Sequence, residues 1–354
     1  MKRAKWFRKL TAGALAVCGL SLAGAGLLAG ESAAGETPSN DDPLTVGYTV
    51  YAMSGWVSSG REGVDAVARD NNIDLRWASA DNSVASQVAH MNQFIAQGVD
   101  AIVVDPVDSA ALGPQIREAR DRGIPVIATN VKVFDPGRQY LNAYVGPDDV
   151  GAGEAQTRAL IEAIGGEGSV VILQGPLGQS GTIDRTEGIE NVLAEYPDVN
   201  VLAMRPGDWK REEGYNIMAS WLSRYGEQID GVISENDDMA VGAIRAMRQR
   251  RINDIPIVGI DGIEAGLQNV AAGHQLMTTL QNAPLQLGMA LQVAASVARG
   301  ESMPEEIFIE MPVVTQDNAE QYYQQMYENR AQFIEELPAL IRRNLASGDY
   351  GSQQ

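Results

Sequence analysis

Polar side chains that can form several hydrogen bonds follow a series of short apolar runs in this sequence. The clearest run is 231–234, which is followed by a stretch of carboxylates and an amide and then by apolar residues at helical spacing. The same order recurs along the chain. The residues after these runs that could hold a ligand are Asp105, Asn130, Asn236 and Asp261. Carboxylates and amides together match the lone pairs and protons of a small polyhydroxylated molecule.

Arg185 adds a cation to this set. It lies in the first turn of a helix predicted to begin near Thr182, after the glycine-rich segment 174–182. A cation is unfavourable near the positive end of a helix dipole, which indicates a function. Its guanidinium could donate a fork of hydrogen bonds to vicinal hydroxyls or to a carboxylate. The alternative is an exposed surface arginine. The segment 174–182 is neither a Walker loop nor a G-x-G-x-x-G motif.

Trp56 and Gln281 complete the candidate binding residues. Trp56 could present a flat apolar face to the C–H side of a sugar ring, or it could simply pack in a core. Gln281 carries an amide in a segment that connects a strand to a helix. Together with the residues above, these two side chains predict a binding pocket for a small polar molecule.

The sequence offers no machinery for an enzyme. It contains two histidines, His90 and His274, and both are expected to be exposed. There is no Ser-His-Asp set, H-E-x-x-H motif or paired metal-ligand spacing. The acidic pairs 148–149 and 237–238 are consecutive residues, which point apart on a helix. We therefore expect a binding protein with no catalytic residues, no metal site and no cofactor.

Strands alternate with helices along most of the chain, which predicts an α/β fold with parallel sheets. We expect two doubly wound parallel-sheet lobes joined by a three-segment hinge, with crossings near 142–149, 281–284 and 311–315. Open sheets of this kind bind ligands at the carboxyl ends of their strands. The last helix is expected to be kinked or split at Pro338. The predicted divisions are 44–145 plus 283–312 for the first lobe, 146–282 plus 313–346 for the second, and 347–354 as a disordered tail.

The first 34 residues are typical of a secretory signal peptide. A basic stretch precedes the apolar segment 11–30, and Ser32-Ala33-Ala34 fits a cleavage site near Ala34. Residues 35–43 are then a polar tether. A permanent membrane anchor is one alternative, although five glycines interrupt the apolar run. A lipoprotein modified at Cys18 is another, although the preceding Val17 is bulky where a small residue is expected.

The cysteine content and the net charge argue against several kinds of site and partner. Cys18 is the only cysteine, so the cleaved chain would contain no disulfide and no thiolate site. The formal net charge of −19 disfavours binding to nucleic acid or to an anionic membrane surface. We expect an exported protein that is not inserted in the membrane after cleavage of the signal peptide.

Six segments resemble motifs of the ribose-type periplasmic sugar-binding proteins of ABC transporters. The resemblance covers about Leu44 to Asn318. The segments are QGVDAI at 97–102, GIPV at 123–126, DRTEG at 184–188, NDDMAVGA at 236–243, VGIDG at 258–262 and VTQDN at 314–318. DNA-binding repressors share this core, but the export signal and the absence of a helix-turn-helix motif argue against that branch.

The resemblance implies a role for each matching residue. Asn130 occupies the place where the family often has an aspartate that holds ring hydroxyls. Two departures suggest a rebuilt pocket in the first lobe: Asn130-Val131 replaces the usual Asp-Arg, and 54–57 reads SGWV where the family has N-P-F-F. The residues implied to contact a sugar from the second lobe are Arg185, Asn236, Asp261 and Gln281.

The function that the resemblance implies is capture of a monosaccharide or cyclic polyol between two closing lobes, followed by delivery to the membrane permease of an ABC importer. The resemblance also implies that the protein is a monomer in the periplasm. Two alternatives remain open from the sequence. The same fold could carry a ligand to a chemoreceptor or serve a quorum-type signal. A secreted sugar-modifying enzyme is the second, although the sequence supplies no base or nucleophile for it.

Overall fold

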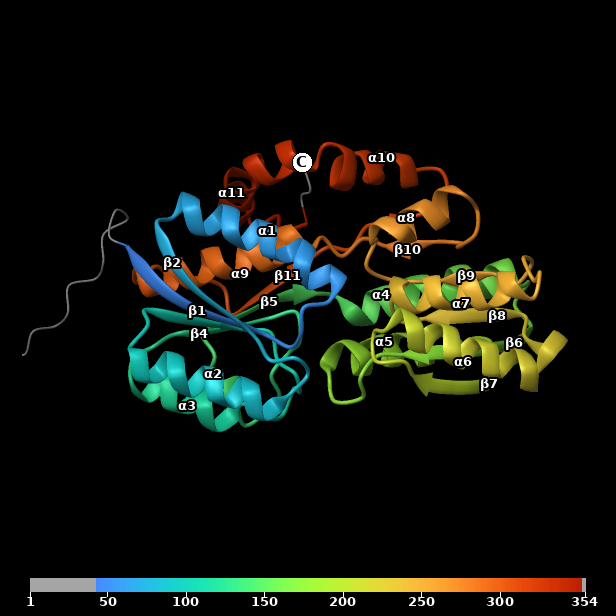
Figure 1. The fold of residues 1–354 in the computed structure, drawn as a ribbon, viewed down its shortest axis with the longest axis horizontal. Coiled ribbons are helices and arrows are strands. Elements are labelled where there is room, and N and C mark those ends of the chain that lie inside the picture. The colour runs from blue at the N-terminus through green and yellow to red at the C-terminus, as the bar shows by residue number, and fades with distance from the viewer. Residues whose placement is uncertain (1–42, 352–354) are drawn as a thin grey trace, which may run out of the picture. The chain divides into compact units, whose positions relative to one another are not determined.

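The computed structural model describes residues 43–351 (Figure 1). The predicted signal peptide 1–34 and nearly all of the tether 35–43 lie outside these described residues. Within the described part of the chain, none of the helices has the length and apolar character needed to cross a membrane.

The first lobe is built on a six-stranded parallel sheet. Its central strands are short runs of Val, Ile and Ala that are buried on both faces, as expected where helices cover both sides of a parallel sheet. The strand order is β11-β5-β4-β3-β1-β2. The strands are β1 (Leu44–Val50), β2 (Ile73–Ser79), β3 (Ala101–Val104), β4 (Val126–Thr129), β5 (Ala143–Pro147) and β11 (Glu306–Ile309).

Helices cover both faces of this sheet (Figure 1). Helices α1 (Gly55–Asp70) and α9 (Ala283–Ala298) pack together on one face, and α2 (Val84–Gln97) and α3 (Gly113–Asp121) lie on the other. A short 3₁₀ turn, η1 (Arg138–Tyr140), precedes β5. The hydroxyl of Ser83 accepts a hydrogen bond from the Ser86 N–H at 3.2 Å and so caps the N-terminus of α2.

The second lobe repeats the architecture on a four-stranded parallel sheet with the order β7-β6-β8-β9. Helices α6 and α7 pack on one face and α4 and α5 on the other. The strands are β6 (Gly168–Gln174), β7 (Val199–Pro206), β8 (Gly231–Ser234) and β9 (Ile257–Val258). The helices are α4 (Asp149–Ala163), α5 (Ser180–Leu193), α6 (Arg211–Arg224), η2 (Gly226–Gln228), α7 (Asp237–Gln249) and α8 (Glu264–Ala271).

Three connections join the lobes, at the places where the sequence predicts crossings. They are the β5–α4 junction, the link from β10 (Thr278–Thr279) to α9, and the link from β11 to β12 (Val313–Val314). Strands β10 and β12 pair antiparallel between the lobes. The fold is therefore the predicted one: two parallel α/β lobes with a three-segment hinge.

Two helix starts differ from what the sequence favours. Helix α5 begins at Ser180, two residues before Thr182. Asp208 is a residue type that favours an N-cap, but α6 is preceded by Lys210, with no side-chain cap. The reason is the backbone: Asp208 and Trp209 both have left-handed φ angles, of 54° and 59°, which turn the chain sharply before the helix.

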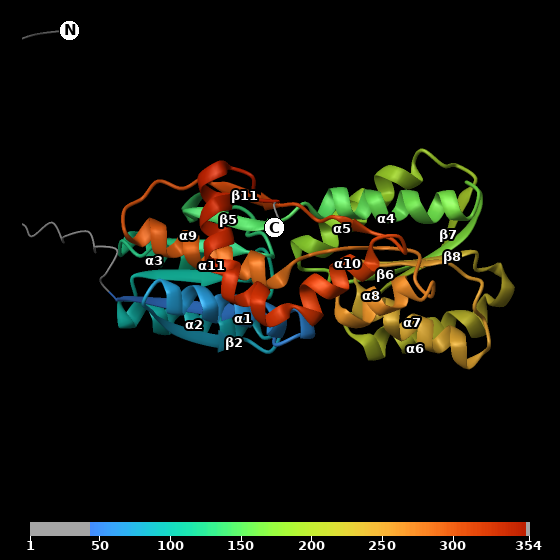
Figure 2. The same cartoon turned by 90° about the horizontal axis from the view of Figure 1, so that it is seen from above.

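The C-terminal segment differs from the prediction in three ways (Figure 2). It consists of α10 (Ala319–Tyr323), a π-helical turn η3 (Gln324–Glu328) and α11 (Arg330–Ser347), so the helix breaks at η3 while Pro338 lies inside α11. Helix α11 packs on α1 and α9, so it belongs with the first lobe instead of the second. Tyr350, in the expected disordered tail, packs against the core of the first lobe.

Arg330 ties this segment to α1. Its side chain, 20% exposed, pairs with Glu62 at 2.8 Å and donates to the backbone and hydroxyl oxygens of Ser59 at 3.2 and 3.0 Å. We expect Arg330→Ala to lower the free energy of unfolding by about 1–3 kcal/mol. Most of this loss comes from the hydrogen bonds that the charged guanidinium donates to Ser59, because the exposed ion pair with Glu62 contributes little. Urea denaturation measures the change. The control is Arg342→Ala, at a second arginine of α11, which removes a more exposed ion pair with Asp70. An equal loss of stability in the two variants would contradict the prediction.

Candidate functional site

Six of the seven predicted binding residues line one cavity of about 40 Å³ between the lobes. We call it the central cavity. Trp56 and Asn130 come from the first lobe, Gln281 comes from the hinge, and three residues come from strand ends or helix starts of the second lobe. These three are Arg185, Asn236 and Asp261. The seventh residue, Asp105, is not among the lining residues.

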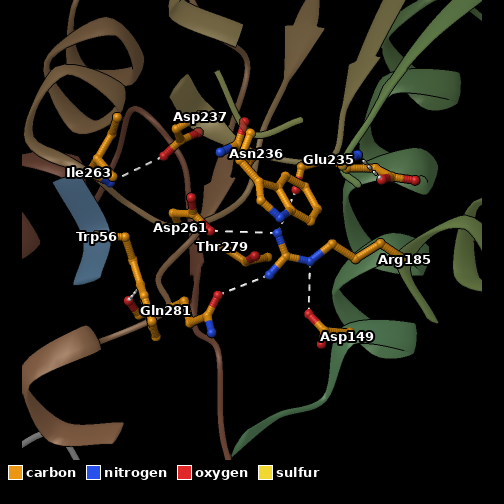
Figure 3. A network of polar contacts seen from close by, with 12 residues as sticks. Trp56, Asp149, Arg185, Glu235, Asn236, Asp237, Asp261, Ile263, Thr279 and Gln281 are labelled. Atoms are coloured by element: carbon orange, nitrogen blue, oxygen red, sulfur yellow. Dashed lines mark hydrogen bonds and ion pairs between the residues drawn. The ribbon is translucent and has the colours of Figure 1, made fainter. Parts of the chain in front are cut away.

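Arg185 is the centre of the network (Figure 3). Its side chain projects from the first turns of α5 and is buried, with 5% of the residue exposed. The Nε atom donates to Asp149 Oδ1 at 2.8 Å, and Nη2 donates to Gln281 Oε1 at 2.9 Å. Nη1 donates to the Glu235 carbonyl oxygen and lies 3.6 Å from Asp261 Oδ1. The alternative of an exposed surface arginine is therefore wrong.

Burial and neighbouring charges shift the pKa values of the groups in this network in opposite directions. Burial disfavours the charged guanidinium, but the carboxylates of Asp149 and Asp261 outweigh it and raise the pKa of Arg185. Burial raises the pKa of Asp261 well above its ordinary value, and Arg185 offsets part of that rise. Asp261 also has a φ of 119°, an unusual conformation for a non-glycine residue that holds its side chain at the cavity.

Asn130 and Gln281 link the first lobe to Arg185. Gln281 Nε2 donates to Asn130 Oδ1 at 2.9 Å while its Oε1 accepts from Arg185. Asn130 Nδ2 lies 3.3 Å from Asp105 Oδ1, and Asp105 is fully buried behind it. Asp105 is predicted to contact the ligand, but it does not line the cavity. It lies at the sheet edge, as expected for a residue that follows a strand, and Asn130 stands between it and the cavity. Its contribution is to orient the Asn130 amide.

Trp56 and Asn236 each combine a structural role with a place in the cavity wall. Trp56 is 7% exposed and packs in the first-lobe core, yet it also lines the cavity, with Nε1 donating to the Gln281 carbonyl oxygen at 2.9 Å. Asn236 caps α7 by accepting from the Met239 N–H at 2.9 Å and lines the cavity as well. A structural role does not exclude either residue from the site.

Sequence reasoning missed several lining residues, of which Trp209 and Asp149 matter most. The Trp209 ring lies 5.3 Å from the Arg185 guanidinium, and its Nε1 donates to Gln179 Oε1 at 2.7 Å. The signal was present, since an aromatic residue at the carboxyl end of β7 is in the right place. Asp149 was considered only as half of an acidic pair, although it starts α4 directly after a crossing. Tyr51, Ser54 and Gln179 also line the cavity.

Direct contacts close one side of the cleft between the lobes. Lys132 Nζ pairs with Asp184 Oδ2 at 2.7 Å, and the Lys132 N–H donates to Ser180 Oγ at 2.7 Å. The Ser180 N–H donates in turn to Ser109 Oγ at 2.9 Å. We call these four residues the interlobe clasp. They show that the lobes are closed on this side.

Two buried carboxyl groups support the site from behind. Glu235 accepts from the Gly175 N–H at 2.8 Å and from the Thr186 hydroxyl at 2.6 Å. Asp237 accepts from Gln275, Thr278 and the N–H groups of Gly262 and Ile263, which fixes the turn after Asp261. Burial raises the pKa of Glu235 to about 8 and that of Asp237 to about 7, although these hydrogen bonds act in the opposite direction.

These shifts predict that the protein loses stability as the pH rises. A carboxyl group whose pKa is raised by folding stabilises the folded state fully below its unfolded pKa of about 4, and that contribution is lost as the pH passes the folded value. We expect the melting temperature to fall between about pH 4 and pH 8. Glu235→Gln should reduce the fall, whereas Glu264→Gln, at an exposed carboxyl group, should not. Calorimetry at several pH values tests this; parallel curves for wild type and Glu235→Gln would refute it.

The histidines lie outside the cavity lining. His90 is half-buried, with Nδ1 3.1 Å from Thr49 Oγ1, so its predicted exposure is wrong. His274 is exposed as predicted. Among the described residues, no group of three or more His, Cys, Asp or Glu side chains is arranged to hold a metal ion.

The chain is similar to known proteins along most of its length. A family model described as a periplasmic binding protein domain matches residues 46–302. A xylitol-binding protein of Mycolicibacterium smegmatis is 43% identical over 337 residues, which is 95% of each chain. A putative rhizopine-binding protein of Rhizobium meliloti is 32% identical over 74% of this chain and 86% of its own.

A solved structure has the same architecture. An ABC transporter solute-binding protein from Bacillus halodurans with bound myo-inositol superimposes with a TM-score of 0.75 and is 29% identical, covering 79% of this chain and 97% of its own. The matched family and these relatives are binding proteins, which agrees with the prediction that the chain is not an enzyme. Together with the fold and the motifs, these matches show that the chain belongs to the periplasmic binding protein family.

Proposed function

We propose that this protein captures a small polyol or monosaccharide between its two lobes and delivers it to the membrane permease of an ABC importer. The observation that carries the proposal is the central cavity: fork-shaped, amide and carboxylate groups from both lobes converge there around the buried Arg185. The xylitol bound by one relative and the myo-inositol bound in a structural neighbour are ligands of this chemical class.

Ligand hydroxyls would replace hydrogen bonds that the site residues now make with one another. The Arg185–Gln281 and Gln281–Asn130 contacts are of the right kind, since a hydroxyl can both accept from a guanidinium and donate to an amide oxygen. Trp56 and Trp209 supply apolar surface from opposite lobes for the C–H groups of the ligand.

Entry of the ligand would require the lobes to separate. A volume of about 40 Å³ has room for only a few water molecules, so the closed arrangement is too small to admit a polyol unchanged. A ligand that contacts both lobes only in the closed form shifts the hinge equilibrium toward that form. The closed form would then dock on the permease as a monomer.

The location proposed is the periplasm, after cleavage of the signal peptide near Ala34. The family match supports this placement. Mass spectrometry of the exported protein tests the cleavage site, because a lipid-modified Cys18 would leave a different N-terminus and added mass.

A thermal-shift screen tests the proposed ligand class. Xylitol, other pentitols and hexitols, myo-inositol, pentoses and hexoses, with amino acids and short peptides for comparison, are added to the purified protein without its signal peptide. A bound ligand at 100 times its Kd stabilises the folded state by about 2.7 kcal/mol, which raises the melting temperature by several degrees. A panel in which amino acids or peptides shift the melting temperature and polyols do not would overturn the proposal.

A further inference from the structure

A second, larger cavity adjoins the central one. Its volume is about 420 Å³, which is within the range of small-molecule pockets. The two cavities share part of their walls, so the second space, which we call the side cavity, lies directly beside the central cavity. The shared lining residues are Trp56, Asp238, Asp261 and Gln281.

The C-terminal segment forms the outer wall of the side cavity. Met326 and Tyr327, in the π-helical turn η3, line it, and both lie beyond residue 302, where the family match ends. Their positions are fixed: Met326 is buried, and the Tyr327 hydroxyl donates to the Gly262 carbonyl oxygen at 3.1 Å. Arg330, the first residue of α11, donates to the Met326 carbonyl oxygen at 3.1 Å. The wall is therefore a built feature of this chain.

The two sides of the cleft differ. On one side the interlobe clasp brings the lobes into direct contact, and Gly178 there is so close to Asp108 that a Cβ at Gly178 would collide with its carboxylate. On the other side the side cavity leaves space between α1, α8 and the C-terminal segment. While the clasp stays closed, the side cavity is the space that these contacts leave beside the central cavity for a longer ligand.

The chemistry of the lining defines what could extend there. Trp56, Met326 and Tyr327 offer apolar and aromatic surface, and the carboxylates of Asp238 and Glu264 offer hydrogen-bond acceptors. The single guanidinium in the lining, that of Arg211, is already paired with Asp238 at 2.7 Å. Apolar faces with acceptors at the edge suit a neutral hydroxylated group, and the surplus of carboxylates disfavours a phosphate or a uronate.

We propose that the side cavity is an extension subsite, which receives a neutral glycosyl substituent of a polyol whose other end occupies the central cavity. The inference rests on the proposed function, because it assigns the polyol end to the central cavity. It makes Met326, Tyr327 and Ala265, which also lines the side cavity, determinants of ligand length.

Calorimetric titrations with two kinds of probe test this subsite. Xylitol and sorbitol represent the bare polyol, and maltitol and lactitol represent a polyol carrying a glycosyl group. We expect wild type to bind at least one of the extended probes within about tenfold of the bare polyol. Ala265→Trp, which fills the side cavity from α8, should weaken the extended probe at least tenfold and leave the bare polyol unchanged. Ala271→Trp, at an exposed position of the same helix, is the matched control and should change neither.

The outcomes separate the two proposals. Binding of xylitol or sorbitol with no binding of maltitol or lactitol overturns the extension subsite and leaves the proposed function intact. An equal loss of both kinds of probe in Ala265→Trp also overturns it, because the substitution would then act on the central cavity. Absence of binding by all four probes, with a different ligand class found in the thermal-shift screen, overturns both.

Discussion

Replacing Arg185 with lysine is expected to weaken binding of the best polyol by at least about tenfold. Lysine keeps the positive charge that Asp149 and Asp261 require, so the fold should persist, but it cannot supply the fork of donors that reaches both Gln281 and the cavity. Each hydrogen bond by a charged group contributes about 1.5–3 kcal/mol, and 1.4 kcal/mol is a factor of ten in affinity. Arg185→Ala should weaken binding further, and it should also lower stability because two buried carboxylates lose their counter-charge.

Titration calorimetry measures the affinity, and circular dichroism reports whether each variant is folded. Arg158→Ala is the control, since it removes an exposed pair with Glu195 on the surface of the second lobe. Unchanged affinity in a folded Arg185→Lys protein would remove Arg185 from the binding site.

Gly175→Ala is expected to lower affinity by about tenfold or more without unfolding the protein. A Cβ at this position would overlap the Trp209 ring and the Thr182 hydroxyl, so the indole must move. Because the ring lies against the Arg185 guanidinium and lines the central cavity, its displacement removes apolar surface from the ligand and a cation–π contact from the arginine. Trp209→Ala should have an effect of similar size, since both substitutions remove the same surface.

Gly113→Ala is the matched control for this substitution. A Cβ there, at the start of α3, meets only ordinary contacts at 3.5 Å, so affinity should stay at the wild-type value. Titration calorimetry measures the affinity. It is preferred to tryptophan fluorescence because the chain has five tryptophans, and Trp209 is only one of them. Wild-type affinity in Gly175→Ala would show that the Trp209 ring does not contribute to binding in its present position.

Much of the site follows from one local rule. Polar residues after buried strands meet at the carboxyl edge of a parallel sheet, and that rule correctly brought together Asn130, Asn236 and Asp261. The rule could not tell which of these side chains line the cavity and which lie behind them. Asp105 follows a strand just as Asn130 does, yet only the packing of the neighbouring strand ends decides which of the two side chains lines the cavity.

The errors come from backbone and tertiary effects that a sequence pattern does not contain. Asp208 is a residue type that often caps a helix, but its left-handed backbone turns the chain so that Trp209 lines the cavity. Pro338 favours a helix break, yet α11 continues through it because packing against α1 and α9 outweighs the local preference. The break occurs in η3, where the chain passes from α8 of the second lobe to α1 of the first.

A crystal structure of the protein with the polyol that raises its melting temperature most is the most direct test of the two-lobe binding site. It should show one ligand between Trp56 and Trp209, with its oxygens within hydrogen-bonding distance of Arg185, Asp261 and Asn236. A ligand bound to one lobe alone, or at a surface distant from Arg185, would contradict the account.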